Sequence, residues 1–429
     1  MIIIVGGGPA GRMAALRLAH AGRKVTIIEK RKLGGQCVFD GCMLICGLND
    51  AARALANARH LQSLGIIKGS VEVDYPHLLE KLETTQSKLS HVIEKETKDA
   101  GVEIEYGKTA EVRDGAVFVD GIKREAEAVI LAGGAELRMP DIPGISVSGV
   151  YTPRSIRTMR TLPKKMVIVG GGISGAEFAY IYASFGVEVT LLARSKVLSV
   201  LPETLRLDAL RDLEAVDIRE NVTVERIEGD TSVEAVVADG KRIPCDAVLV
   251  AAGFTHESSW ISGIEKRADG SVLTDETMQT SLKGVYAAGD ICGAPYFTPA
   301  ARMRGFAAAD AILGNPHCIN LSQQPFTVVL GFDYTVCPAA ENGTTLEAFN
   351  IAGPGAFWHV TDSTVGHMQI TVSEDKKVLG FASSSPSGGA VGTYLGHMVR
   401  NGLYSKEFLS LLEVHPLPDG LYSLIRFSA

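Results

Sequence analysis

The stretch that decides the fold is IIIVGGGPAG, residues 2–11, an apolar strand that runs into glycines at Gly6, Gly8 and Gly11. A helix-compatible segment and a second apolar strand follow, and that strand ends at Glu29. Glycines at this spacing permit a tight turn, close approach of the backbone to a pyrophosphate, and close packing of helix on strand. An acid at the end of the second strand can bind a ribose hydroxyl. The stretch therefore predicts a βαβ unit that binds a dinucleotide.

The same unit recurs later in the chain, around Gly170, Gly172 and Gly175. A second dinucleotide fold predicts a second dinucleotide. Here the second strand runs into Ala193 and Arg194, without an acid that could bind the ribose. The missing carboxylate removes repulsion toward a 2′-phosphate, and an arginine can pair with that group. We therefore favour NADPH over NADH, which stays possible; the alternative interpretation of Arg194 is an ordinary solvated cation.

The composition argues against several classes of protein. Of the 429 residues, 46% are hydrophobic and 21% charged, as expected for a globular protein of two or three domains. The net charge of −7 argues against binding to nucleic acid or to an anionic membrane, and no apolar run approaches the roughly 20 residues that cross a bilayer. Seven cysteines, an odd number, do not resemble a secreted disulfide framework. We expect a cytoplasmic protein and predict no metal site.

Two cysteines follow the first βαβ unit, in the stretch GGQCVFDGC at residues 34–42. Residues five apart on a regular helix diverge by roughly 140°, at about 100° per residue. A disulfide between Cys37 and Cys42 therefore requires an irregular turn, which Gly41 could supply. A pair of thiols beside a two-electron cofactor can pass electrons to a disulfide substrate.

These motifs, in this order, resemble the flavoprotein disulfide reductases that use a pyridine nucleotide, the group of lipoamide dehydrogenase, glutathione reductase and mercuric reductase. The resemblance spans nearly the whole chain and implies sites for FAD and for a nicotinamide nucleotide. Its implied FAD residues are Gly6, Gly8, Gly11, Glu29, Gly35, Gly134, Gly289 and Asp290. Its implied nicotinamide-nucleotide residues are Gly170, Gly172, Gly175, Glu177 and Arg194.

The resemblance also implies an α/β fold of two doubly wound, Rossmann-like domains and a C-terminal α+β dimerisation domain. The expected division is an FAD-binding domain at 1–148 and 273–318, an NAD(P)-binding domain at 149–272 and an interface domain at 324–429. The implied molecule is a homodimer. In it Cys42 touches the flavin, Cys37 meets the substrate, and His415 from the partner subunit acts as acid and base.

The sequence departs from the family in three places. The family has a lysine four residues after its second cysteine, where this chain has Cys46. The loss of this lysine removes the usual cationic partner of Glu177. Cys46 in its place is a third thiol, a soft-metal ligand or a small buried hydrophobe. The family has an acid five residues after its catalytic histidine, where this chain has Gly420, so either Asp419 orients His415 or His415 lacks a carboxylate partner. Finally, Thr255-His256-Glu257 stands where the family has an Arg-x-Pro-Asn turn, and the sequence offers no functional account of that change.

The leading hypothesis is an enzyme that moves electrons between NAD(P)H, FAD and a small-molecule or protein-bound disulfide, with a lipoamide-like compound as the best single substrate. A second hypothesis is an NAD(P)H-dependent quinone, oxygen or metal-ion reductase with an auxiliary dithiol. A third is a sensory flavoprotein without catalysis, which the missing lysine suggests. The substrate's identity and the direction of electron flow are not encoded in any motif.

Overall fold

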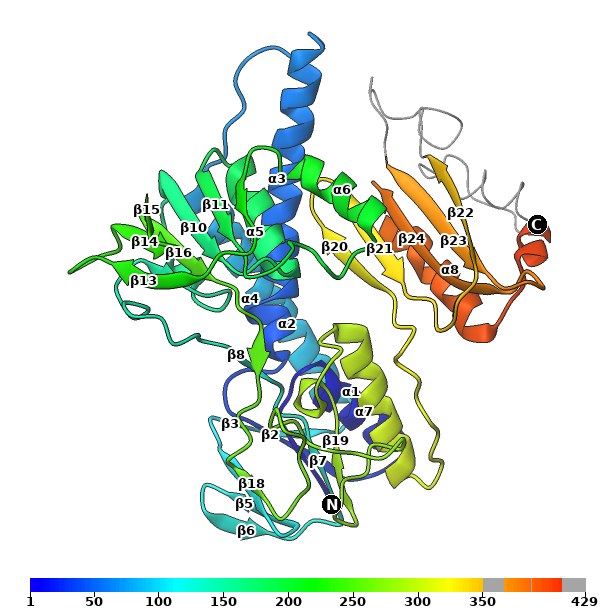
Figure 1. The fold of residues 1–429 in the computed structure, drawn as a ribbon. Helices are drawn as coiled ribbons and strands as arrows, with labels where there is room; N and C mark the ends of the chain where they lie inside the picture. The colour runs from blue at the N-terminus through cyan, green and yellow to red at the C-terminus, as the bar shows by residue number, and fades with distance from the viewer. Residues whose placement is uncertain (350–365, 387, 411–429) are drawn as a thin grey trace. The chain divides into compact units, whose positions relative to one another are not determined.

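The computed structural model describes residues 1–349, 366–386 and 388–410, arranged in two compact units (Figure 1). Unit 1 comprises Met1–Leu44, Pro76–Met139 and Gly253–Leu321. Unit 2 comprises Ile45–Tyr75, Pro140–Ala252 and Ser322–Ala429. The division into three domains stays a prediction. The two predicted FAD-binding segments fall mainly in unit 1, and the other two predicted domains fall mainly in unit 2.

The centre of unit 1 is a parallel five-stranded sheet in the order β19-β7-β1-β2-β3. Its strands are β1 (Ile2–Val5), β2 (Val25–Glu29), β3 (Glu103–Tyr106), β7 (Ala128–Leu131) and β19 (Val285–Ala287). The helices of this unit are α1 (Pro9–His20), α2 (Gly35–Phe39), most of α4 (Tyr75–Asp99) and α7 (Thr298–Ile312). Smaller strands are β4 (Ala110–Arg113), β5 (Ala116–Val119), β6 (Ile122–Arg124), β8 (Glu136–Leu137), β17 (Phe254–Thr255) and β18 (Ile261–Ser262).

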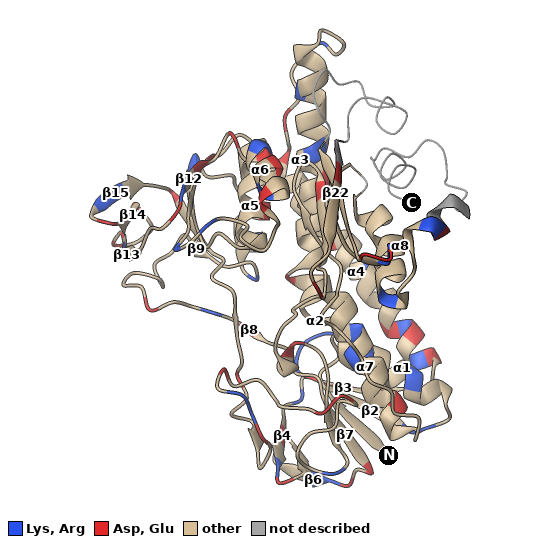
Figure 2. Cartoon of the chain, turned by 45° about the vertical axis from the view of Figure 1, so that its right-hand side comes forward, with Lys and Arg blue, Asp and Glu red and all other residues tan. Residues whose placement is uncertain are grey.

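Strands β1 and β7 of unit 1 are apolar at every position because both faces of the sheet are covered. Ile2 and Ile4 share one core cluster with apolar residues of α1 and α7, which Figures 1 and 2 both show side by side. Ile3 and Val5 point the other way and pack with Val112, Val117 and other residues of β4 and β5. In Figure 2 the charged residues of this unit lie largely on helices and loops. The continuous apolar run therefore reflects a strand buried on two sides.

Unit 2 repeats the parallel sheet, in the order β12-β11-β10-β16-β9. Its strands are β9 (Val150–Tyr151), β10 (Lys165–Val169), β11 (Glu188–Leu192), β12 (Asp217–Arg219) and β16 (Ala247–Val250). Its helices are α5 (Ile173–Ser184), α6 (Glu203–Asp212) and most of α3 (Cys42–Ser63). An antiparallel meander of β13 (Val224–Glu228), β14 (Ala235–Ala238) and β15 (Lys241–Pro244) packs on the sheet through a shared apolar cluster.

The rest of unit 2 is an antiparallel sheet in the order β20-β21-β24-β23-β22, with α8 packed on one face (Figure 1). The elements are β20 (Phe326–Val329), β21 (Asp333–Cys337), β22 (Thr344–Phe349), β23 (His367–Val372), β24 (Val378–Ser385) and α8 (Gly388–Asn401). Three short 3₁₀ turns complete the described elements, η1 (Ile156–Thr158), η2 (Asp290–Cys292) and η3 (Ser405–Ser410). Two parallel sheets and a C-terminal α+β part confirm the predicted fold class.

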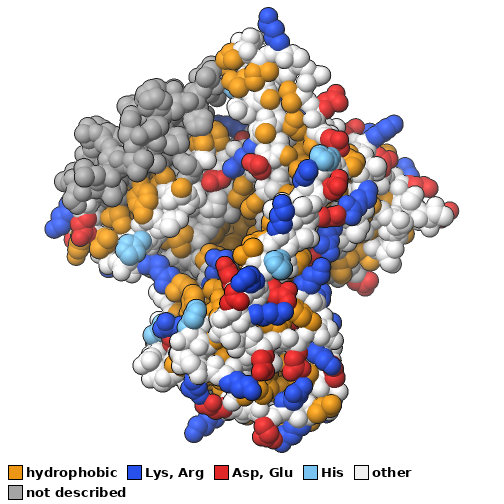
Figure 3. Space-filling model, turned by 180° about the vertical axis from the view of Figure 1, so that it is seen from behind, with side chains coloured by type: hydrophobic (Ala, Val, Ile, Leu, Met, Phe, Trp, Pro, Cys, Tyr) orange, Lys and Arg blue, Asp and Glu red, His pale blue; other side chains and the backbone are white. Residues whose placement is uncertain are grey.

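Charged side chains of both signs lie on the surface (Figure 3). Figure 3 shows basic and acidic side chains interleaved over the described part of the face seen from behind. No helix among the described residues is long and apolar enough to cross a membrane.

The glycine turns generate a prediction about stability. A Cβ at Gly11 would lie 2.0 Å from the Gly6 carbonyl oxygen, whereas a Cβ at Gly8 meets nothing within 4 Å. We expect Gly11→Ala to destabilise the apoprotein by roughly 1–3 kcal/mol or more, because backbone must move to admit the methyl group. Thermal melts of Gly8→Ala, in which the methyl group has room, serve as the matched control. Equal melting temperatures for the two variants would contradict this account of the turn.

Candidate active site

The first glycine turn has the geometry of a pyrophosphate site. Gly6 has φ of +105°, and a Cβ there would lie 2.3 Å from the Ala132 carbonyl oxygen, so only glycine fits. Gly8 is the N-cap of α1, faces open space and carries no capping side chain. The first N–H groups of α1 can therefore bind an anion, with the helix dipole in its favour.

Glu29 ends β2 beside this turn and is held in a fixed orientation. Its Oε2 accepts a hydrogen bond from Gly7 N at 2.7 Å, and its Oε1 accepts one from Arg31 N at 2.7 Å. A carboxylate has about four lone pairs, so capacity remains for a ribose hydroxyl. Unit 1 thus brings the predicted ribose acid to the predicted phosphate turn.

The other predicted FAD residues of unit 1 surround the same turn. A Cβ at Gly35 would lie 3.0 Å from the Cα of Gly8, and a Cβ at Gly289 would lie 2.9 Å from the Cβ of Ala10. Gly134 has φ of +78° and faces open space. Burial raises the pKa of Asp290 at the start of η2. These positions fit a bound FAD because the backbone is close where a turn is needed and open where the cofactor would lie.

The two predicted redox cysteines lie on separate helices of unit 1. Cys37 is in α2, Cys42 is the first residue of α3, and Asp40 and Gly41 separate the helices. The irregular turn expected from the spacing is therefore present. The hydrogen bond to Cys37, and next burial, raise the pKa of Cys42. Because two adjacent thiols share their protons, the raised pKa belongs to the second ionisation of the pair.

Thr298 is a site residue that the sequence reasoning missed. It begins α7, and its hydroxyl oxygen lies 3.4 Å from Cys37 Sγ and 3.6 Å from Cys42 Sγ. Its hydrogen bond lowers the pKa of Cys42, against the effect of Cys37. The sequence carried half of the signal, since Thr before Pro299 marks a helix start. Nothing in it linked that helix start to thiols more than 250 residues earlier.

Cys46 lies one turn after Cys42 in α3 and is exposed. The interpretation of this residue as a small buried hydrophobe is therefore wrong. Residues four apart share a helix face, so its thiol follows that of Cys42 on the same side of α3. No cluster of three metal-ligating side chains occurs in the part of the chain that the structure describes.

The second glycine turn, in unit 2, repeats the geometry of the first. Gly170 has φ of +125°, and its Cβ would lie 2.3 Å from the Ala251 carbonyl oxygen. A Cβ at Gly175 would lie 1.8 Å from the Gly170 carbonyl oxygen, and Gly172 faces open space. Close backbone contact at the first and third glycines, with space at the second, again fits a dinucleotide pyrophosphate.

The two remaining nucleotide-site residues differ in their surroundings. Arg194 is exposed just beyond the carboxyl end of β11. Glu177 is buried in α5, and its Oε1 accepts a hydrogen bond from Val329 N at 3.1 Å. A backbone N–H from the antiparallel sheet thus contributes to holding the carboxylate whose family partner, a lysine, is replaced in this chain.

His415 and Asp419 lie outside the described residues, so their predicted roles stay predictions.

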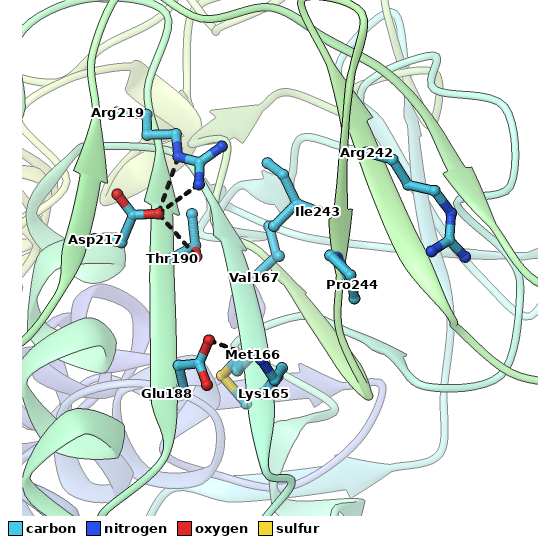
Figure 4. Close-up of a pocket in the computed structure, with 10 residues that line it drawn as sticks. All are labelled: Lys165, Met166, Val167, Glu188, Thr190, Asp217, Arg219, Arg242, Ile243 and Pro244. Atoms are coloured by element: carbon cyan, nitrogen blue, oxygen red, sulfur yellow. Dashed lines mark hydrogen bonds and ion pairs between the residues drawn. The ribbon is translucent and has the colours of Figure 1, made fainter.

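Figure 4 shows a hollow of about 180 Å³ in unit 2, between β10–β12 and β15. Its charged side chains include two ion pairs, Lys165–Glu188 and Arg219–Asp217. It lies toward the amino-terminal end of β10, whereas nucleotides bind at the carboxyl ends of parallel strands, and no predicted site residue lines it.

Comparison with known proteins identifies the class. Residues 1–305 match the family model of the pyridine nucleotide-disulphide oxidoreductases. A dihydrolipoyl dehydrogenase of Bacillus subtilis is 28% identical, covering 96% of this chain and 93% of that protein. One of Chlorobaculum parvum is 31% identical, covering 73% of this chain and 70% of that protein.

Solved structures agree on the fold. The HOCl-induced flavoprotein disulfide reductase RclA of Escherichia coli, as its Cu(II) complex, superposes with a TM-score of 0.87 at 22% identity, over 100% of both chains. LpdA of Mycobacterium tuberculosis gives 0.87 at 23% identity, over 100% of this chain and 99% of that one. The chain therefore belongs to the pyridine nucleotide-disulphide oxidoreductase family. It is an oxidoreductase of the kind that uses FAD, a nicotinamide nucleotide and a disulfide.

The contact of Thr298 with both thiols generates a prediction about reactivity. Because its hydroxyl donates to Cys37 Sγ and lies beside Cys42 Sγ, Thr298→Val should destabilise the thiolate of the pair and shift thiolate formation to higher pH, by about 0.5–1 unit for one hydrogen bond. The measurement is the rate of iodoacetamide alkylation of the reduced protein against pH, resolved for Cys37 and Cys42 by mass spectrometry. Thr298→Ser keeps the hydroxyl and should follow the wild type. A profile unchanged in the valine variant would refute the role of Thr298.

Proposed function

We propose that the protein is an NADPH-dependent disulfide oxidoreductase in which Cys37 and Cys42 form the redox-active pair. The observation that carries this proposal is the approach of both sulfurs to Thr298, with Gly35 of the same segment against the first nucleotide turn. A dithiol is thus held in the unit that carries the FAD residues, as two-electron transfer requires.

The cysteine chemistry follows from the exchange of thiolate and disulfide. Cys37 as thiolate attacks a substrate disulfide, forms a mixed disulfide and releases the first substrate thiolate. Cys42 then attacks the Cys37 sulfur, releases the second substrate thiolate and closes the Cys37–Cys42 disulfide. Bound FAD supplies the electron pair that reopens this disulfide, and NADPH is its source. Each released thiolate takes up one proton, for which we propose His415 of the partner subunit, oriented by Asp419.

The preference for NADPH is supported by the end of β11. Arg194 is exposed there and Ala193 provides no carboxylate. Among the nearby acids, Glu220 already accepts hydrogen bonds from Val197 N at 2.7 Å and from Arg206 Nη2 at 2.5 Å. A 2′-phosphate could therefore meet the Arg194 guanidinium without facing an acid at the strand end.

A lipoamide-like disulfide is the substrate we favour, in a homodimer located in the cytoplasm. Several relatives that cover nearly the whole chain are named dihydrolipoyl dehydrogenase, and members of the family are typically homodimers acting on disulfides. A second candidate function, reduction of a soft metal ion, is favoured by the exposed thiol of Cys46 one turn after Cys42.

The dithiol proposal predicts a spectroscopic signature. Anaerobic titration of the FAD-loaded protein with NADPH should produce a long-wavelength thiolate-to-flavin absorption band before the flavin bleaches. Cys42→Ser should lose that band, and Cys46→Ser, which leaves the pair intact, should keep it. Direct bleaching of the wild type without the band would reject the redox-active pair. Fast reoxidation by a soft metal ion that requires Cys46 would support the second candidate.

The nucleotide proposal predicts a change in cofactor choice. Arg194→Ala should lower kcat/KM for NADPH by roughly tenfold to a hundredfold, because a charge-assisted hydrogen bond to phosphate is lost. The value for NADH should change by less than about threefold, since NADH lacks the phosphate. Lys196→Ala, two residues further on and equally exposed, is the charge-matched comparison. Equal losses with both nucleotides in Arg194→Ala would show that Arg194 does not recognise the 2′-phosphate.

A further inference from the structure

The loop of residues 289–294, which carries the predicted flavin acid Asp290, has all six of its backbone carbonyl oxygens hydrogen-bonded. Three of these oxygens accept backbone N–H groups: Gly289 O from Cys292 N, Asp290 O from Gly293 N and Ile291 O from Val272 N, at 2.9–3.1 Å. Each of these hydrogen bonds restricts the conformation of the loop.

Arginine side chains hold most of the loop. Arg304 Nη1 donates to Gly289 O at 3.0 Å and to Gly293 O at 2.7 Å, and its Nη2 donates to Ala294 O at 2.8 Å. Arg267 Nη1 donates to Cys292 O at 2.9 Å. The planar fork of an arginine suits several carbonyl groups at once, which a lysine ammonium cannot match.

His256 completes the set of donors. It belongs to the Thr255-His256-Glu257 segment, and its Nε2 lies 3.3 Å from Asp290 O and 3.4 Å from the hydroxyl of Tyr296. Its Nδ1 is buried without a hydrogen-bond partner in the described part of the chain. Nε2 is therefore the nitrogen that most favourably carries the proton toward Asp290. The segment that departs from the family pattern thus contacts the flavin loop.

Arg304 is also a buried cation that lacks an ion pair. It is 6% exposed, and none of the salt bridges among the described residues includes it. A buried charge needs a counter-charge nearby. Asp290 is the acid that Arg304 affects: burial raises the pKa of Asp290, and Arg304, followed by His256, acts to lower it.

The Asp290 carboxylate itself accepts no hydrogen bond from the residues that the structure describes, although the loop around it is fully bonded. An ionised carboxylate in such a place is an acceptor for hydroxyl donors of a ligand. Within the proposed function, that ligand is FAD, whose ribityl chain presents hydroxyl groups.

We infer that Arg304 is a positioning residue for FAD: it holds loop 289–294 through three carbonyl oxygens and so fixes the place from which Asp290 meets a ribityl hydroxyl. The inference rests on the proposed function, because it assumes that FAD occupies unit 1. The titratable and charged groups that face Asp290 are Arg304 from α7, His256 from the segment after β17, Arg267 through the loop, Cys292 in the loop and Tyr296 just after it.

The test is the affinity of the apoprotein for FAD, followed by flavin fluorescence across pH. Binding should be strong above the pKa of Asp290 and weaken as pH falls through it, because the protonated acid is a poorer acceptor. Arg304→Gln should weaken binding roughly tenfold to a hundredfold near neutral pH and shift this acid limb to higher pH by about one unit or more. Arg304→Lys keeps the charge but loses the fork, so binding should weaken at all pH values without a shift of the limb.

Two further variants separate the possible outcomes. Arg302→Gln removes an exposed charge from the same helix and should match the wild type. Asp290→Asn should abolish the acid limb. If FAD affinity falls at the same pH in Arg304→Gln as in the wild type, the inference is overturned. If the glutamine variant does not fold, a shift of this pH in Arg304→Lys overturns the inference instead. Failure of the wild-type apoprotein to bind FAD at any pH would instead overturn the proposed function.

Discussion

The close passage of helix over strand at the two glycine turns is the constraint on which the rest of the structure depends. At Gly11 and at Gly175, a Cβ would lie 2.0 Å and 1.8 Å from the carbonyl oxygen of the glycine five residues earlier. Because no side chain separates the two elements, the first N–H groups of each helix lie at the carboxyl edge of a parallel sheet. In unit 1 the segments of Gly35 and Gly289 pack directly on this turn, so the dithiol and the flavin loop are placed by it.

The two cysteines of the proposed redox pair lie where regular structure is interrupted. A single helix would separate Cys37 from Cys42 around its axis, but α2 ends at Phe39 and α3 begins at Cys42. The start of α7 brings Thr298 to both sulfurs. Opposing effects then act on the pKa of Cys42, because the thiol of Cys37 raises it and the hydroxyl of Thr298 lowers it. A nucleophilic thiolate requires this kind of local balance rather than a buried, uniformly apolar site.

Backbone groups hold two buried charged side chains, Glu177 in unit 2 and Arg304 in unit 1. The lysine expected four residues after the second cysteine is the exposed Cys46, and Glu177 accepts a backbone N–H from Val329. In unit 1, the buried Arg304 binds carbonyl oxygens of the loop that carries Asp290. The two glycine turns are built from backbone and do not depend on these side chains.

The sequence by itself determined the two βαβ units, their order and the position of the dithiol, because strand periodicity, glycine spacing and cysteine spacing are local properties of the chain. It also predicted an irregular turn between Cys37 and Cys42, because a disulfide between residues five apart does not fit a regular helix. Only the tertiary structure decided that Thr298 meets the thiols, that Val329 binds Glu177 and that Arg304 holds loop 289–294. The first two contacts join residues 256 and 152 positions apart. The contact of Arg304 could not be predicted from the sequence either, because the pattern of a helix does not show whether an arginine points to solvent or to buried carbonyl groups. Packing, not periodicity, decides these contacts.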